Sequence, residues 1–223
     1  MAIDKCIKKI KVFYHVCMIN HWFKIVEEHI KLMIEYGLYD RVDKIYIGAV
    51  GKEPEFKKLK EFAEGFPKME IVDYDSNLLR YEFLTLKILQ KHSQKEDFYG
   101  LYFHTKGCSY PSNEGGKFWR DYMNWYNIVE WNKALCHIER DKYDMYGVKL
   151  LSARKAPAYA LHYSGNFFWF NSEYIRTLCD INTLDQTNRI NAELWACSNY
   201  PIAATGCQEF VDYNNKGKFV PYE

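Results

Sequence analysis

The sequence lacks the cysteine pattern of a disulfide-stabilised or zinc-binding protein. Its seven cysteines are scattered along 223 residues with no C-x-x-C pair, which is typical of reduced thiols in an intracellular setting and disfavours a zinc site. No apolar run approaches the roughly 18 residues that a membrane span needs, and no signal peptide is recognisable. Together these absences predict a soluble, cytoplasmic protein.

An excess of charge of either sign is also missing. Lys and Arg number 30 against 29 Asp and Glu, so the formal net charge is +1. Neither nucleic acid nor an anionic membrane surface is therefore expected as a partner. Because no internal repeat, low-complexity segment or linker divides it, the chain of 223 residues is expected to form a single domain with a large core.

Four familiar catalytic templates are absent: G-x-S-x-G, the P-loop G-x-x-x-x-G-K-S/T, G-x-G-x-x-G and H-E-x-x-H. Serine hydrolases, P-loop NTPases, Rossmann dehydrogenases and zinc proteases are thus disfavoured. Aromatic residues, by contrast, make up 17% of the chain. Their rings suit stacking on sugars or bases, although we expect most of them in the core.

Strand-like and helix-like segments alternate in the first half of the chain. The expected strands are 11–18, 44–50, 69–72 and 98–103; the expected helices are 21–36, one from Pro54 to Gly65, and one with a buried stripe of Leu79, Phe83, Leu86 and Leu89. Asn20 is expected to cap the first helix, and Asp75 or Ser76 the third. This alternation predicts an α/β fold with a mainly parallel sheet that is covered on both faces.

The second half of the chain is more aromatic and less regular. We expect a long helix over about 117–137, a strand over 146–151, an aromatic strand over 162–170 that Ser-Gly-Asn interrupts, and helices over about 171–178 and 188–197. These segments extend the α/β arrangement of the first half.

A basic loop directly follows the expected strand 98–103 and consists of His104, Thr105, Lys106 and Gly107. In open α/β sheets, ligands bind at this end of the strands. A lysine and a histidine there suit an anion such as a diphosphate, and the glycine lets backbone come close to it. The alternative is a surface lysine beside a loop histidine, but the position after a buried strand favours the anion site.

Two carboxylates, Asp73 and Asp75, stand at the end of the third expected strand. Such a pair can hold Mn²⁺ or Mg²⁺, with a diphosphate supplying further ligands. The simpler interpretation is that Asp75 caps the following helix and that Asp73 is solvated.

Residues 162–166 (HYSGN) precede the aromatic block 167–170 (FFWF). Amide and hydroxyl groups beside aromatic faces are typical of a sugar pocket. Alternatively, the segment is a central strand whose glycine lets a neighbour approach. Since four consecutive aromatic side chains cannot all point the same way, part of this alternative must hold.

Arg189 and Glu193 are four residues apart in an expected helix. Spacing alone favours an i,i+4 ion pair, worth about 0.3–0.5 kcal/mol if exposed. The alternative is that Glu193 activates or orients the hydroxyl of an acceptor.

Several segments, taken in order, resemble one known family. They are FYH (13–15), YGLYD (36–40), YEF-x-TL (81–86), LYFHTKG (101–107), HYSGNFFW (162–169) and R-x-x-AE-x-W (189–195). Their order and wording resemble small GT-A-type glycosyltransferases of bacterial polysaccharide gene clusters and large DNA viruses, over about residues 10–197. H-T-K-G and S-G-N-F-x-W are the specific parts of this resemblance.

The resemblance implies a GT-A-like fold and a transferase for hexose or deoxyhexose in polysaccharide biosynthesis. Its partners would be a nucleotide-sugar donor, UDP-linked, and a glycan acceptor, with Mn²⁺ or Mg²⁺ as cofactor. Residues 1 to about 107 would form the nucleotide-binding half, and about 108–223 the sugar and acceptor half. Whether the domain belongs to a longer multidomain polypeptide stays open.

The family's site residues can be carried over onto matching positions. The nucleotide would contact His15, Val16, Cys17 and Arg80, and its diphosphate would contact His104 and Lys106. The metal would be bound by Asp73 and Asp75. The sugar and the acceptor would contact Gly165, Asn166, Trp169 and Arg189. Glu193 would take the acceptor proton in an inverting reaction. The chain departs from the family in one respect: the acidic motif typically follows the fourth strand, where this chain has the basic H-T-K loop.

Two other classes compete with the glycosyltransferase. A non-catalytic carbohydrate-binding protein would explain the aromatic residues without nucleotide or metal. A phosphoryl-transferring enzyme of nucleotide metabolism would turn over nucleotides without any glycan.

Overall fold

The computed structural model describes residues 8–112, 116–151 and 160–206, and at its centre is a sheet of order β3-β2-β1-β4-β8-β5-β9. The strands are β1 (Lys9–Met18), β2 (Lys44–Gly51), β3 (Met69–Asp75), β4 (Phe98–His104), β5 (Met145–Gly147), β8 (Phe168–Asn171) and β9 (Ala203–Thr205). The first four are parallel, β8 is antiparallel to both neighbours, and β9 is parallel to β5. The predicted mostly parallel α/β sheet is confirmed. A second small sheet pairs β6 (Leu150–Leu151) with β7 (His162–Tyr163).

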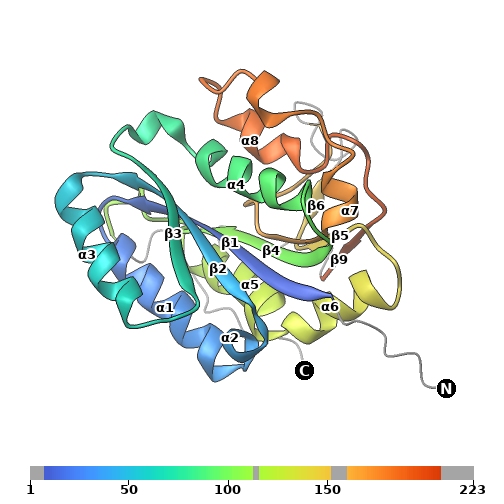
Figure 1. Cartoon of the computed structure of the whole chain (residues 1–223), viewed down its shortest axis with the longest axis horizontal. Helices are drawn as coiled ribbons and strands as arrows, with labels where there is room; N and C mark the ends of the chain where they lie inside the picture. Colours follow the sequence, from blue (N-terminus) through green and yellow to red (C-terminus); the bar gives the residue numbers. More distant parts are fainter. Residues whose placement is uncertain (1–7, 113–115, 152–159, 207–223) are drawn as a thin grey trace.

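Helices cover both faces of the sheet (Figure 1). One face carries α1 (Trp22–Glu35), α2 (Leu38–Arg41), α3 (Glu53–Glu64), α5 (Lys117–Asn124) and α6 (Trp131–Glu139), and the other carries α4 (Phe83–Ser93), α7 (Ser172–Ile175) and α8 (Ile190–Trp195). Side chains alternate along β1. Val12 and Tyr14 belong to the hydrophobic core between the sheet and α1, whereas Phe13 and His15 face α4. Because both faces are covered, the strands are almost continuously apolar.

The starts of two predicted helices differ from the structure. Asn20 does not cap α1: its backbone is left-handed, with φ of 51°, and its side chain donates to the carbonyl oxygen of Cys108 at 3.0 Å. The third predicted helix begins later, because Asn77 caps a short 3₁₀ turn, η1 (Leu78–Arg80), ahead of α4. Leu79 is consequently 64% exposed and does not belong to the buried stripe.

The long helix predicted over 117–137 is interrupted by a π turn, η2 (Trp125–Val129), between α5 and α6. The carbonyl oxygen of Asn127 accepts a hydrogen bond from Trp169 Nε1 at 2.9 Å. A carbonyl diverted to such a partner explains the widened turn. The strand predicted over 146–151 is likewise split, because Lys149 has a φ of 51°. Among the helices of the described residues, none is long and apolar enough to cross a bilayer.

Candidate functional site

One row of residues across the carboxyl ends of four strands defines the region of the site. His104 on β4 is opposite His15 on β1, His15 is opposite Gly48 on β2, and Gly48 is opposite Asp73 on β3. Three strand spacings separate β3 from β4, which is roughly 14 Å. The structure thus brings the two histidines together and leaves Asp73 and Asp75 at the far side of the same edge.

Thr105 ties the basic loop to the end of β1. Its Oγ1 accepts from the backbone N–H of Cys17 at 2.9 Å, and its own N–H donates to the His15 carbonyl at 3.1 Å. Thr105 is buried. Through these bonds the predicted nucleotide-side residues of β1 and the H-T-K-G loop form one continuous rim. The side chain of Val16 points into the core on the opposite face, so only its backbone can border a ligand.

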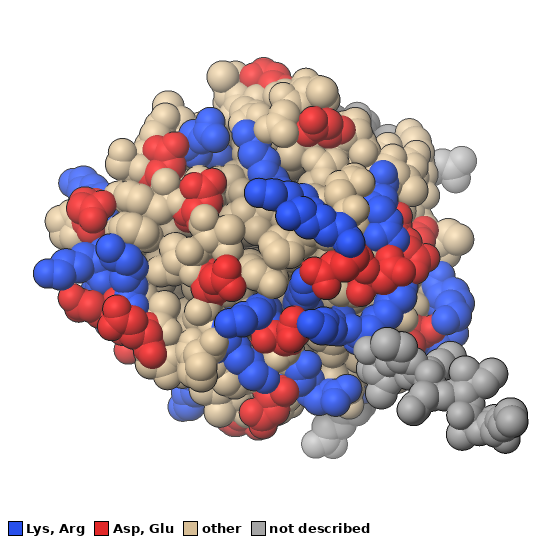
Figure 2. All heavy atoms as spheres, viewed as in Figure 1, with Lys and Arg blue, Asp and Glu red and all other residues tan. Residues whose placement is uncertain are grey.

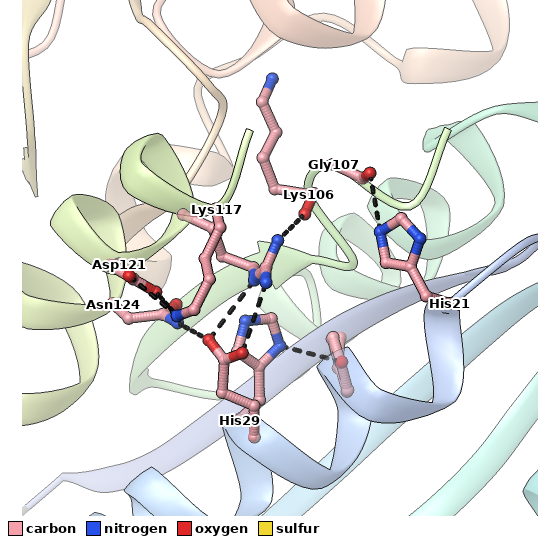
Figure 3. Close-up of polar contacts among 10 residues, drawn as sticks. His21, His29, Lys106, Gly107, Lys117, Asp121 and Asn124 are labelled. Carbon is pink, nitrogen blue, oxygen red and sulfur yellow. Dashed lines mark hydrogen bonds and ion pairs between the residues drawn. The ribbon is translucent and has the colours of Figure 1, made fainter. Parts of the chain in front are cut away.

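Lys106 supplies the positive charge of this rim. Its ammonium has no hydrogen-bond or ion-pair partner among the residues that the structure describes, and its side chain is only partly buried. Its backbone carbonyl, by contrast, accepts from Arg120 Nη1 at 3.0 Å. Figure 3 shows the Lys106 side chain extending away from this contact. A cation on a fixed backbone, with no counter-ion in the described part of the chain, is suited to binding a phosphate.

His104 contributes hydrogen bonds rather than charge. Burial, and then the positive charge of Lys106, lowers the pKa of His104 to about 3. Its Nε2 lies 3.0 Å from the carbonyl oxygen of Gly165, which can only accept, so Nε2 carries the proton. Burial likewise lowers the pKa of His15 to about 4. Both imidazoles are neutral at pH 7.

A half-buried carboxylate, Glu82, joins three elements beside His104. It accepts from the Tyr102 hydroxyl at 2.8 Å and from the Asn166 side-chain amide, and its Oε1 is 4.0 Å from His104 Nε2. Gly165 and Asn166 both have left-handed backbones, with φ of 89° and 58°. Glu82 therefore fastens the predicted sugar-side turn to the end of β4. Glu82 belongs to the segment YEF-x-TL, but nothing in the local sequence indicates this role.

Glu193 and Arg189 also come close to this cluster. They form an i,i+4 ion pair, with Nη2 and Oε1 3.9 Å apart. Burial raises the pKa of the Tyr102 phenol, and the charges of Glu82 and then Glu193 raise it further. The spacing prediction of an ion pair is confirmed, and the negative charge of Glu193 acts on the Tyr102 phenol.

The carboxylates of Asp73 and Asp75 are occupied by local contacts. Asp73 accepts from the Tyr74 N–H at 2.9 Å, and Asp75 accepts from the Asn77 N–H at 2.8 Å and pairs with Arg80 at 3.4 Å. Within the described residues no group of three or more His, Cys, Asp or Glu could hold a metal ion. Arg80 is the counter-ion of Asp75, and both carboxylates lie across the edge of the sheet from the basic loop.

Trp169 is a correction to the predicted site. Its side chain is fully buried in the core, where its Nε1 donates to Asn127. Alternation along β8 turns this ring away from the face on which His104 lies. It therefore cannot cover a sugar ring.

A buried polar cluster, which the sequence analysis missed, lies behind the loop. Arg120 on α5 pairs with Glu28 on α1 at 3.3 Å, and Asn124 donates to Glu28 at 3.2 Å (Figure 3). Arg120 is completely buried. No local pattern marks it, because its partner is 92 residues away.

Residues 13–209 match the model of a family described as a domain of unknown function, DUF8361. The chain belongs to this family. A search of the curated proteins finds no match.

Among solved structures, the chain is similar to 4-diphosphocytidyl-2C-methyl-D-erythritol synthase from Anaerococcus prevotii DSM 20548 (10% identity, 89% of this chain and 88% of that chain, TM-score 0.46). It is also similar to a protein from Desulfovibrio desulfuricans G20 described as a nucleotide-diphospho-sugar transferase (9%, 89% and 80%, 0.46). A third is Rv0371c from Mycobacterium tuberculosis H37Rv (7%, 90% and 90%, 0.45). With TM-scores below 0.5, these likenesses do not bear on the activity. The sheet itself confirms the predicted α/β class with a mostly parallel central sheet.

Proposed function

We propose that this protein is a glycosyltransferase that moves a sugar from a nucleotide-diphosphate sugar, UDP-linked, to a glycan acceptor. The observation that carries the proposal is the ammonium of Lys106 at the carboxyl edge of the sheet, which has no partner within residues 8–112, 116–151 and 160–206. It stands beside a neutral His104 and next to the turn of Gly165 and Asn166. A diphosphate and the sugar attached to it need these two kinds of group side by side.

The reaction requires stabilisation of a leaving group. An acceptor oxygen attacks the anomeric carbon, the bond from that carbon to the phosphate oxygen breaks, and the nucleoside diphosphate departs with both bonding electrons. Its negative charge grows in the transition state, where a fixed cation stabilises it most. Lys106 has this role in the proposal, and no step depends on a metal.

The acceptor proton needs a base. Glu193 is the proposed base, because its carboxylate is partly exposed and its charge helps to raise the pKa of the Tyr102 phenol, which hydrogen-bonds to the same carboxylate as Asn166. Glu82 is more buried and already accepts two hydrogen bonds, so it is better placed to hold the turn. Asp73 and Asp75 stay a proposed site for Mn²⁺ or Mg²⁺ that would act on the donor from the far side of the edge.

The proposal is tested with a panel of nucleotide sugars, by calorimetry and by transfer to glycans, with and without Mn²⁺. A glycosyltransferase binds one donor and transfers its sugar, whereas a carbohydrate-binding protein ignores both UDP and Mn²⁺. Glu193→Gln should slow transfer at least about 100-fold while leaving donor affinity within twofold. Turnover that survives this substitution would exclude Glu193 as the base, and nucleotide turnover without glycan would contradict the proposal itself.

A further inference from the structure

The buried pair of Arg120 and Glu28 is unusual because it lies behind the loop rather than in it. The Arg120 side chain has 0% exposure and that of Glu28 24%. Two guanidinium nitrogens, Nη2 and Nε, approach the carboxylate at 3.3 and 3.4 Å. A buried ion pair by itself is weak evidence for stability, since apolar residues of similar volume often serve as well. Stability alone therefore does not explain this ion pair, and its other contacts indicate a second role.

The remaining guanidinium nitrogen, Nη1, points to a second role of Arg120 in holding the loop. While Nη2 and Nε face Glu28, Nη1 donates to the carbonyl oxygen of Lys106 at 3.0 Å. The planar fork of an arginine can serve both acceptors at once in fixed geometry, which the single ammonium of a lysine cannot. Arg120 thus joins the loop backbone to a carboxylate on α1.

Neighbouring carbonyls of the loop are held in the same way. His21 Nε2 donates to the Gly107 carbonyl at 3.1 Å, and Asn20 Nδ2 donates to the Cys108 carbonyl at 3.0 Å. Three consecutive carbonyls, of residues 106 to 108, therefore accept from side chains outside the loop. Figure 3 shows the contacts of the first two, on Lys106 and Gly107. The backbone is fixed on one side, and the Lys106 ammonium is left on the other.

The carboxylate that orients Arg120 is itself held. Asn124 donates to Glu28 Oε1 at 3.2 Å. Next to Glu28 on α1, His29 is bonded through Nδ1 to the Tyr14 hydroxyl on β1 at 2.9 Å. Burial lowers the pKa of His29, so this imidazole stays neutral and adds no charge to the cluster. The cluster connects the loop to both α1 and the central strand.

We infer that Arg120 is a positioning residue for Lys106: the Arg120–Glu28 pair fixes the loop backbone so that the Lys106 ammonium meets the diphosphate of the donor. The inference rests on the proposed function and deepens it. According to this inference, Arg120 contributes to the affinity for diphosphate although its side chain does not contact the ligand. This contribution acts entirely through Lys106.

The experiment uses inorganic pyrophosphate as the probe, because it needs no particular base or sugar. The variant Glu28→Gln/Arg120→Met removes both charges together and leaves no buried ion alone, so it should fold. We expect its Kd for pyrophosphate to rise about tenfold. In the Lys106→Ala background, the same pair of substitutions should change the Kd by less than twofold, since nothing remains to be positioned.

The matched control is the variant Lys11→Met/Glu96→Gln. It neutralises another ion pair with a buried cation, near the opposite edge of the sheet. It should leave the Kd for pyrophosphate unchanged even where it lowers the melting temperature. Circular dichroism and unfolding curves on all variants separate a lost fold from a lost affinity.

Two results would overturn the inference. If Lys106→Ala weakens binding but the Arg120 and Glu28 substitutions do not, or act equally in both backgrounds, Arg120 positions nothing while the proposed function stands. If the unaltered protein binds neither pyrophosphate nor UDP, the anion site itself is wrong and both proposals fail.

Discussion

At the scale of single residues, the site depends on which groups are charged. The basic loop contains a histidine and a lysine, but burial keeps His104 neutral and leaves Lys106 as its cation. His15 in the neighbouring strand is neutral for the same reason. Lys106 therefore supplies positive charge, and the imidazoles of His104 and His15 supply directed hydrogen bonds.

Acid should destabilise the protein through these histidines. Their pKa values fall on folding from about 6.5 to about 4 for His15 and about 3 for His104. The unfolded chain thus binds more protons between these values, so the stabilisation is complete above pH 6.5 and is lost as pH falls toward 4. Between pH 7 and 5, each histidine should cost up to about 2 kcal/mol of unfolding free energy.

Urea unfolding at both pH values measures this effect. His104→Gln should reduce the loss on acidification by its own share. The control variant His137→Gln, at a side chain that is 39% exposed, should leave the loss unchanged. An identical acid response in wild type and His104→Gln would contradict the assignment of a neutral, buried His104.

At the scale of elements, α4 packs closely against the sheet at Gly48 of β2. A Cβ on Gly48 would lie 2.3 Å from Thr85 Oγ1 and 3.1 Å from Thr85 Cα. The same hydroxyl lies 3.0 Å from His15 Nδ1, so this contact also orients a histidine of the site. The close packing at Gly48 keeps the start of α4 near the sheet, so that Glu82, which precedes the helix, can accept the hydrogen bond from Tyr102.

Gly48→Ala should consequently lower the unfolding free energy by roughly 1–3 kcal/mol, because α4 must shift to admit a methyl group. Gly65→Ala is the matched control, since its Cβ would meet only the Phe62 carbonyl oxygen at 3.4 Å. Thermal or urea denaturation compares the two variants. Equal stabilities would show that α4 does not pack as described.

The elements also show how far the sequence could be interpreted. The strands of the first half were predicted because burial on both faces makes them continuously apolar. The break in the helix at Asn127 was not, since it depends on Trp169, 42 residues away. The same holds for the site: His104 and Lys106 were found from their place after a strand, whereas Glu82 binds Asn166 across 84 residues. Long-range partners leave no local pattern.

At the scale of the whole molecule, positive and negative charges are nearly balanced. Positive and negative side chains are interspersed over the face in Figure 2, and the formal net charge is +1. In our proposal, attraction of a diphosphate therefore depends on a local cation, Lys106, whose loop is held by the sheet and by α5. The mostly parallel sheet carries this rim along its carboxyl edge, with the turn at Gly165 and Asn166 facing it from the second half of the chain.

Calorimetry with UDP on two single-charge variants tests the central claim most directly. Lys106→Ala removes the cation of the rim, and Lys91→Ala removes an exposed lysine in the last turn of α4. We expect the first substitution to weaken UDP binding at least about tenfold and the second to change it by less than twofold. No UDP binding by the unaltered protein, or equal losses in the two variants, would contradict a diphosphate site at this edge of the sheet.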